Sequence, residues 1–118
     1  MIRTLFRLGL CAFVVCGIVA FLSMEARAQG AGKDLFLKNQ CNKCHSISAQ
    51  KIDKLKGDEE GGGKQPPDLS HVGKERNAAW ITGWLNRTEK IEGKTHKKKF
   101  TGSPADAQAL ATWLAGLK

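Results

Sequence analysis

The sequence has few of the side chains from which a small protein builds a core. It contains no tyrosine, and aromatic residues make up only 7% of its 118 residues. After residue 28 the aromatic side chains are Phe36, Trp80, Trp84, Phe100 and Trp113. Domains of this size bury little apolar surface and usually need an additional staple. We therefore expect a bound group in the middle of the fold, and a largely unfolded polypeptide without it.

The first 28 residues have the pattern of an export signal. Arg3 and Arg7 precede an uncharged apolar run over residues 8–22, and residues 26–28, Ala-Arg-Ala, match the small-x-small pattern of a cleavage site. The run is shorter than the roughly 20 residues that span a bilayer, which favours a cleaved signal over a membrane anchor. We predict a signal peptide over residues 1–28, one domain over residues 29–118, and a periplasmic or otherwise exported protein that is soluble after cleavage.

Sulfur-containing side chains become scarce once this signal is removed. Cys11 and Cys16 lie within it, and both methionines of the sequence precede residue 25. The remaining thiols are those of Cys41 and Cys44. Residues 29–118 therefore offer one close pair of thiols and no thioether.

This pair belongs to the most informative motif of the chain. Residues 41–45 are Cys-Asn-Lys-Cys-His, which is the C-x-x-C-H attachment signature of c-type haem. On a helix, Cys41, Cys44 and His45 would all address one object, with the thiols on the porphyrin edge and the imidazole on the iron. The motif predicts one covalently attached haem c, held by Cys41, Cys44 and His45.

Two other interpretations of a C-x-x-C pair are weaker here. A zinc site needs about four ligands, and beyond the motif itself residues 29–118 supply only the distant His71 and His96 as histidine or cysteine ligands. A thioredoxin-like redox pair belongs to a βαβ pattern, and no strand-rich segment precedes Cys41.

Hydrophobic periodicity predicts helices and no strands. We expect a short amphipathic helix over residues 33–40, a second helix over residues 77–86, and a last helix that begins at Pro104 with Ser103 as its N-cap. The polar segment between the first two helices contains three consecutive glycines, which predicts a flexible loop over residues 58–64. These elements predict an all-α fold.

Together these features resemble class I c-type cytochromes over roughly residues 32–117. The resemblance rests on a Gly–Phe pair, the haem motif, a Pro-Asp-Leu turn, a Trp-bearing helix, a Phe-Thr-Gly segment and two apolar residues of the last helix. They are Gly32 and Phe36, residues 41–45, 67–69, 77–86 and 100–102, and Leu110 with Trp113.

The resemblance implies a small cytochrome c fold, with three main helices and loops wrapped around one covalently attached haem. It also implies that the first and last helices cross at the Gly, Phe and aromatic positions, and that the Pro67 carbonyl orients His45. From residue chemistry alone, Pro67 is a turn proline. One tryptophan N–H is expected to donate to a haem propionate, and we assign this role to Trp84.

The second axial ligand departs from the family pattern. The family normally uses a methionine from the loop before the last helix, and residues 29–118 contain none. His96 lies in the corresponding loop, although counting back from Phe100 places the ligand nearer Lys98. A neutral imidazole is a common haem ligand, whereas a lysine must first lose its proton. We predict His96 as the second ligand, with a lysine at 97–99, His71 or an open position as alternatives.

These residues predict a one-electron carrier with bis-histidine ligation and a relatively low reduction potential, rather than an enzyme. Removing residues 1–28 lowers the formal net charge from +8 to +6. Lys94 and the lysines at 97–99 would offer a positive rim to an acidic redox partner. An exported chain with no nucleic-acid-binding module is not expected to bind nucleic acid. The alternatives are a five-coordinate haem protein that binds a small gas or is weakly peroxidatic, and a haem subunit of a larger redox complex, including one at a membrane.

Overall fold

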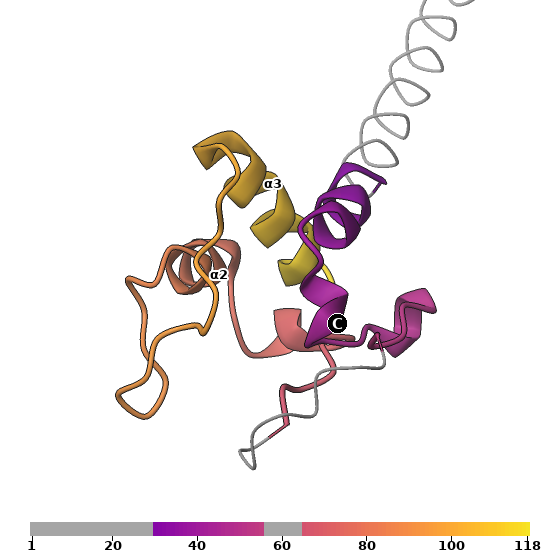
Figure 1. The fold of residues 1–118 in the computed structure, drawn as a ribbon, viewed down its shortest axis with the longest axis horizontal. Coiled ribbons are helices and arrows are strands. Elements are labelled where there is room, and N and C mark those ends of the chain that lie inside the picture. The colour runs from indigo at the N-terminus through magenta and orange to yellow at the C-terminus, as the bar shows by residue number, and fades with distance from the viewer. Residues whose placement is uncertain (1–29, 56–64) are drawn as a thin grey trace, which may run out of the picture. The chain divides into compact units, whose positions relative to one another are not determined.

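The computed structural model describes residues 30–55 and 65–118, shown in colour in Figure 1. The predicted signal peptide over residues 1–28 and the predicted loop over residues 58–64 lie outside the described residues. Over the described part of the chain, α-helices cover residues 30–38, Ala78–Leu85 (α2) and Pro104–Ala115 (α3). Three short 3-10 helices, η1, η2 and η3, cover Cys41–Lys43, Ser48–Gln50 and Val72–Lys74.

The described residues contain no β-strand, only two isolated bridges, Ile47 with Ile52 and Ile91 with Lys94. The predicted all-α fold is therefore confirmed. None of the helices described is long and apolar enough to cross a membrane.

The first helix ends before the C-x-x-C-H motif. The Asn39 side-chain amide donates to the Leu35 carbonyl at 2.8 Å, and Gln40 adopts a left-handed conformation with φ of 55°. A left-handed residue commonly terminates a helix and redirects the chain. The helix predicted over residues 33–40 therefore ends two residues earlier than expected, and Cys41–Lys43 form a separate 3-10 turn, η1.

The helix α2 lies within the predicted range of residues 77–86 and begins and ends one residue inside it. The Asn77 side chain accepts a hydrogen bond from the Trp80 backbone N–H, which caps the first turn. Ile81 and Leu85, four residues apart, are buried on one face. Arg87, with φ of 64°, leaves the helical conformation just after the last turn.

A capping box begins α3. The Ser103 hydroxyl accepts from the Asp106 N–H, the Asp106 carboxylate accepts from the Ser103 N–H, and Pro104 fills the first position. The apolar side chains that follow this box form much of the core. They are Ala107, Leu110, Ala111, Trp113 and Leu114, with Leu117 just beyond the end of the helix.

The first and last helices cross at the positions expected from the resemblance. The rings of Phe36 and Trp113 meet edge to face, with centroids 5.8 Å apart and planes at 61°. Gly32 lies against Trp113, and a Cβ at Gly32 would overlap the Trp113 Cβ and Cγ. α2 and η3 also pack on α3, so α3 contacts the first helix, α2 and η3 (Figure 1).

Replacing Gly32 with alanine should force these two helices apart. We expect Gly32→Ala to lower the free energy of unfolding by about 1–3 kcal/mol, because an added methyl group overpacks a close contact. Gly30→Ala is the matched control, since a Cβ there would meet nothing within 4 Å. The control should leave stability unchanged or raise it by up to about 1 kcal/mol. Urea unfolding of the haem-loaded variants measures both values, and equal effects would contradict the close contact at Gly32.

Candidate functional site

The C-x-x-C-H residues form one tight turn. The backbone N–H groups of Cys44 and His45 both donate to the Cys41 carbonyl, at 3.1 and 3.0 Å. This turn gathers the two thiols and the imidazole within one short stretch of chain. The Cys41 thiol is partly buried and the Cys44 thiol is exposed, and neither is in a disulfide. Burial raises the pKa of Cys41, and nearby Lys98 acts in the opposite direction.

The His45 ring is oriented by a backbone carbonyl, as the resemblance implied. Its Nδ1 donates to the Pro67 carbonyl at 2.9 Å. Because a carbonyl can only accept, the proton lies on Nδ1 and the Nε2 lone pair is free for a metal. Burial lowers the pKa of His45 most strongly, the Pro67 bond raises it, and nearby His96 lowers it further. The ring is therefore neutral at pH 7, which is the form that binds metal.

A carboxylate ties the Pro67 turn to the segment after His45. Asp68 accepts hydrogen bonds from the Ser46 and Ser48 hydroxyls, at 2.7 and 2.6 Å, and from the Ser48 backbone N–H at 3.1 Å. Its other oxygen accepts from the Ser70 N–H at 2.8 Å. These four residues are called the Asp68 cluster below. Its hydrogen bonds, from Ser48, Ser70 and Ser46 in that order, hold the pKa of Asp68 well below its usual range.

His96 lies in a loop over residues 87–102 that is fixed at several points. Glu92 and Gly93 both have positive φ, 50° and 77°, in a tight turn closed by hydrogen bonds between Ile91 and Lys94. The Phe100 N–H donates to the Leu85 carbonyl at 2.9 Å and joins the end of the loop to α2.

Within this loop the His96 ring is oriented in the same way as that of His45. Its Nδ1 donates to the carbonyl of Lys98, two residues further along the chain. A proton on Nδ1 leaves the Nε2 lone pair of His96 free as well.

The imidazoles of His45 and His96 lie close together with nearly parallel planes. The ring centroids of His45 and His96 are 6.2 Å apart, with an angle of 15° between the planes. Two imidazoles on opposite sides of one metal, each bonded at about 2 Å, place the bonded nitrogens about 4 Å apart and the ring centres roughly 6 Å apart. The observed spacing fits one metal ion between the rings. His71, the other histidine considered as a ligand, is exposed at the start of η3.

Aromatic side chains of α2 support the His96 ring. The Trp84 ring lies 5.6 Å from it at an angle of 60°, and Trp80 stacks on Trp84 at 5.5 Å and 16°. The Arg76 guanidinium lies 4.2 Å from the centre of the Trp80 ring, a cation–π contact. The assignment of Trp84 as a propionate donor stays a prediction, and its packing against His96 is a contact that the sequence did not indicate.

The zinc interpretation is not supported by the side-chain arrangement. Among the residues described, no three His, Cys, Asp or Glu side chains converge as a group able to hold a metal ion on their own. Two close, nearly parallel imidazoles, one of which follows two thiols in the same turn, instead match the needs of an iron whose other ligands come from a porphyrin.

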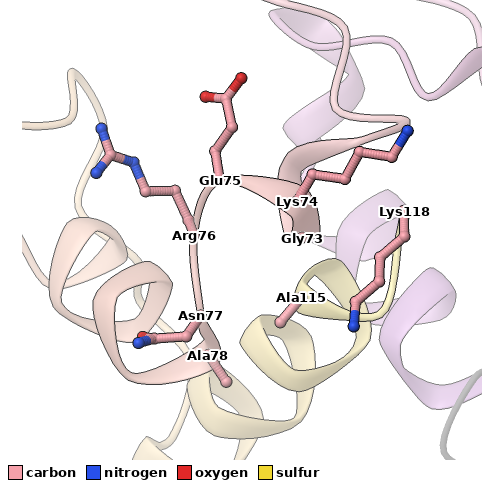
Figure 2. Close-up of a pocket in the computed structure, with 8 residues that line it drawn as sticks. All are labelled: Gly73, Lys74, Glu75, Arg76, Asn77, Ala78, Ala115 and Lys118. Carbon is pink, nitrogen blue, oxygen red and sulfur yellow. The ribbon is translucent and has the colours of Figure 1, made fainter.

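A shallow cavity of about 380 Å³ lies elsewhere, lined by residues 73–78 with Ala115 and Lys118 (Figure 2). It contains none of the predicted site residues. Its charged side chains are those of Lys74, Glu75, Arg76 and Lys118. The one link from them toward His96 is indirect, through the contact of Arg76 with Trp80.

The sequence analysis missed the Asp68 cluster. Its signals were a carboxylate directly after Pro67 and two serines within three residues of the end of the motif, at positions 46 and 48. These lie about 20 residues apart in the sequence, and hydrophobic periodicity says nothing about polar contacts over such a distance. Ser46 directly follows His45 and Asp68 directly follows Pro67. Only this shared placement beside the hydrogen-bonded pair of His45 and Pro67 could have suggested the contact between Ser46 and Asp68.

Comparison with known proteins gives one match. The family model described as cytochrome c matches residues 30–118. Searches of curated proteins and of solved structures found no match.

The lowered pKa of Asp68 predicts a specific loss of stability in acid. An aspartate in the unfolded chain has a pKa of about 3.9. Just below that pH the unfolded carboxylate binds a proton while the folded Asp68 is still ionised, so acid favours unfolding. The contribution of the Asp68 hydrogen bonds to the free energy of unfolding is complete above about pH 4. It is lost as the pH falls through the pKa of Asp68 in the folded protein. Because the carboxylate is exposed, we expect Asp68→Asn to cost on the order of 1 kcal/mol at pH 6 and less at pH 3.

Urea unfolding at the two pH values measures this difference. Asp34→Asn, which removes an exposed carboxylate from the first helix, is the matched control for loss of charge. A cost of Asp68→Asn that is the same at pH 3 and pH 6 would contradict the prediction.

Proposed function

Because the chain belongs to the cytochrome c family, we propose that it carries single electrons on a haem iron bound between His45 and His96. The family match makes it a haem-binding electron-transfer protein with covalently attached haem c, and Cys41 and Cys44 have the spacing that attaches it. When bound, the haem supplies an iron that alternates between the ferrous and ferric states. The observation that carries the bis-histidine proposal is the pair of facing imidazoles, 6.2 Å apart.

The protonation of both rings supports this ligand set. His45 donates through Nδ1 to the Pro67 carbonyl, and His96 donates through Nδ1 to the Lys98 carbonyl. Ligating histidines usually donate their second ring N–H in this way, which fixes the tautomer and increases the basicity of the ligand. Two such imidazoles stabilise ferric iron more than a histidine and a thioether do. A relatively low reduction potential follows, since methionine ligation is what raises it.

The lysines of the His96 loop support an acidic redox partner. Lys94, Lys97, Lys98 and Lys99 are all exposed, and Lys98 is close enough to Cys41 to affect its pKa. Positive charge beside the attachment site would steer a partner of opposite charge toward the haem. We further propose that residues 29–118 are the mature domain of an exported, periplasmic protein. Nucleic acid is no part of this proposal, and attachment to a membrane complex remains a prediction from sequence.

The ligand set is tested by absorption and EPR spectra of both oxidation states. We expect low-spin iron in each, with a rhombic ferric EPR signal because the imidazole planes are nearly parallel. His96→Ala should convert the iron to high spin and allow ready CO binding. His71→Ala is the matched control and should leave the spectra unchanged.

Two results would contradict the proposal. A low-spin spectrum that survives His96→Ala would make another residue the ligand, with the lysines at 97–99 as the next variants to examine. A high-spin wild-type protein that binds CO readily would favour the five-coordinate, gas-binding or weakly peroxidatic alternative.

The lysine rim is tested with small redox reagents of opposite charge. We expect the double variant Lys97→Glu/Lys99→Glu to slow oxidation of the reduced protein by ferricyanide, an anion, by roughly tenfold at low salt. The same variant should speed oxidation by hexaammineruthenium(III), a cation. Lys118→Glu is the control, because this lysine lines the cavity of Figure 2 rather than the His96 loop.

Both effects should fade as the ionic strength rises, because salt screens exposed charges. Rates that do not depend on salt would contradict a docking role for these lysines. So would an effect of Lys118→Glu that is as large, for each charge changed, as that of the double variant.

A further inference from the structure

The geometry points to Asp68 as the residue that positions the Pro67 carbonyl on His45. Through this carbonyl the Asp68 cluster would set the strength of the His45 Nδ1–H bond, and thereby the electron donation of that ligand to the iron. The inference rests on the proposed function only in taking His45 as an iron ligand, and it does not depend on whether His96 is the second one.

The carboxylate joins the two neighbours of the hydrogen-bonded pair. Ser46 directly follows His45 and Asp68 directly follows Pro67, and the Ser46 hydroxyl donates to Asp68 at 2.7 Å. A backbone bond runs beside this one, from the Leu69 N–H to the Ser46 carbonyl at 2.9 Å. The carbonyl that His45 requires is therefore flanked by two links to the segment that carries His45.

Further bonds extend this connection on both sides. Ser48 donates to Asp68 through both its hydroxyl and its backbone N–H, at 2.6 and 3.1 Å. The Ser70 N–H donates to the second carboxylate oxygen at 2.8 Å, and the Ser70 hydroxyl accepts from the Ala49 N–H at 3.0 Å. The carboxylate thus accepts four hydrogen bonds, and charge-assisted bonds of this kind are the stronger ones.

No side chain of residues 65–68 packs in the core and anchors the Pro67 carbonyl, because all four residues are exposed. Proline restricts φ at position 67, but it donates no backbone hydrogen bond that could hold the segment in place. Along the chain, the first buried residue after Pro67 is Ser70, and it is itself a member of the Asp68 cluster. Leu69 is the first apolar side chain after Pro67 to pack on the core, and the hydrogen bonds to Asp68 lie between it and the Pro67 carbonyl. These bonds therefore act beside the Leu69 contact in fixing where this carbonyl lies.

The chemical consequence lies in the charge on the imidazole. A carbonyl held close to Nδ1–H draws the proton away from the ring and makes Nε2 a better donor to the iron. A loosened carbonyl makes Nε2 a weaker donor, which disfavours ferric iron and raises the reduction potential. Losing the negative charge of Asp68 would also raise the potential, so the two causes need separate variants.

Three variants of the full haem-loaded protein separate position from charge. Asp68→Asn removes the charge and weakens the cluster, whereas Ser46→Ala/Ser48→Ala removes two donors and retains the charge. Asp34→Asn is the control for loss of a carboxylate elsewhere. The single variant Ser46→Ala stands in for the double variant if the latter does not take up haem.

Two readouts are measured on each protein. One is the exchange with solvent of the His45 Nδ1 proton, followed by NMR in the diamagnetic ferrous protein, with CO added if the iron is five-coordinate. The other is the reduction potential. We expect about tenfold faster exchange for Asp68→Asn and for the double serine variant, since loss of one such bond corresponds to roughly this factor in an opening equilibrium. Both should also have a higher potential, while Asp34→Asn leaves the exchange unchanged.

The proposal fails if the proton exchanges at the wild-type rate in both Asp68→Asn and the serine variant, which would leave Asp68 a merely structural residue. It also fails if the potential changes in Asp68→Asn alone, because charge and not position would then be the cause. Failure of the proposed function is distinguishable, since loss of His96 ligation appears in the spin state and leaves the His45 proton observable in the CO complex.

Discussion

The proposed iron site depends on one constraint, which is that two imidazole rings must lie on either side of a single metal ion. His45 and His96 come from segments far apart in the sequence, yet their rings lie 6.2 Å apart in nearly parallel planes. Each ring is held through Nδ1 by a backbone carbonyl, that of Pro67 or of Lys98. Neither ring can turn without losing its hydrogen bond, so the fold has to fix two carbonyls relative to each other.

A closed series of contacts fixes them. His45 follows the first helix through the turn η1, and this helix crosses α3 where Phe36 meets Trp113. α3 packs on α2, and the bond from the Phe100 N–H to the Leu85 carbonyl joins α2 to the loop that carries His96. The aromatic contact between the first and last helices takes no part in the chemistry of the proposed iron site. It helps to hold the two imidazole rings at their observed spacing. This explains why a chain with so few aromatic residues places two of them there.

The sequence predicted the elements whose causes are local. Ser103 caps α3 as predicted, because its side chain reaches a backbone N–H group three residues away, and Asn77 caps α2 in the same way. The family resemblance added the close approach at Gly32, which periodicity alone would have treated as an ordinary helix start. The prediction failed at Gln40, where an αL conformation, not a glycine or proline, ends the first helix. It was silent on the bonds to Asp68, because polar contacts about 20 residues apart leave no periodic pattern in the chain.

The two sides of the site are held in different ways. The carbonyl that orients His45 belongs to a residue 22 positions away, and the Asp68 cluster ties that segment down at several points. The carbonyl that orients His96 lies two residues along the same loop, so its bond survives any movement of the loop as a unit.

Local bonds of this kind preserve the orientation of a ring but do not fix its distance from the opposite ring. That distance depends on the links to α2 and on the packing of Trp84 against His96. The lysines beside His96 are exposed, so few buried contacts hold this part of the loop in place. Loop segments with few buried contacts open at lower free energy than core elements. Of the two proposed iron bonds, the one to His96 is therefore expected to break before the one to His45.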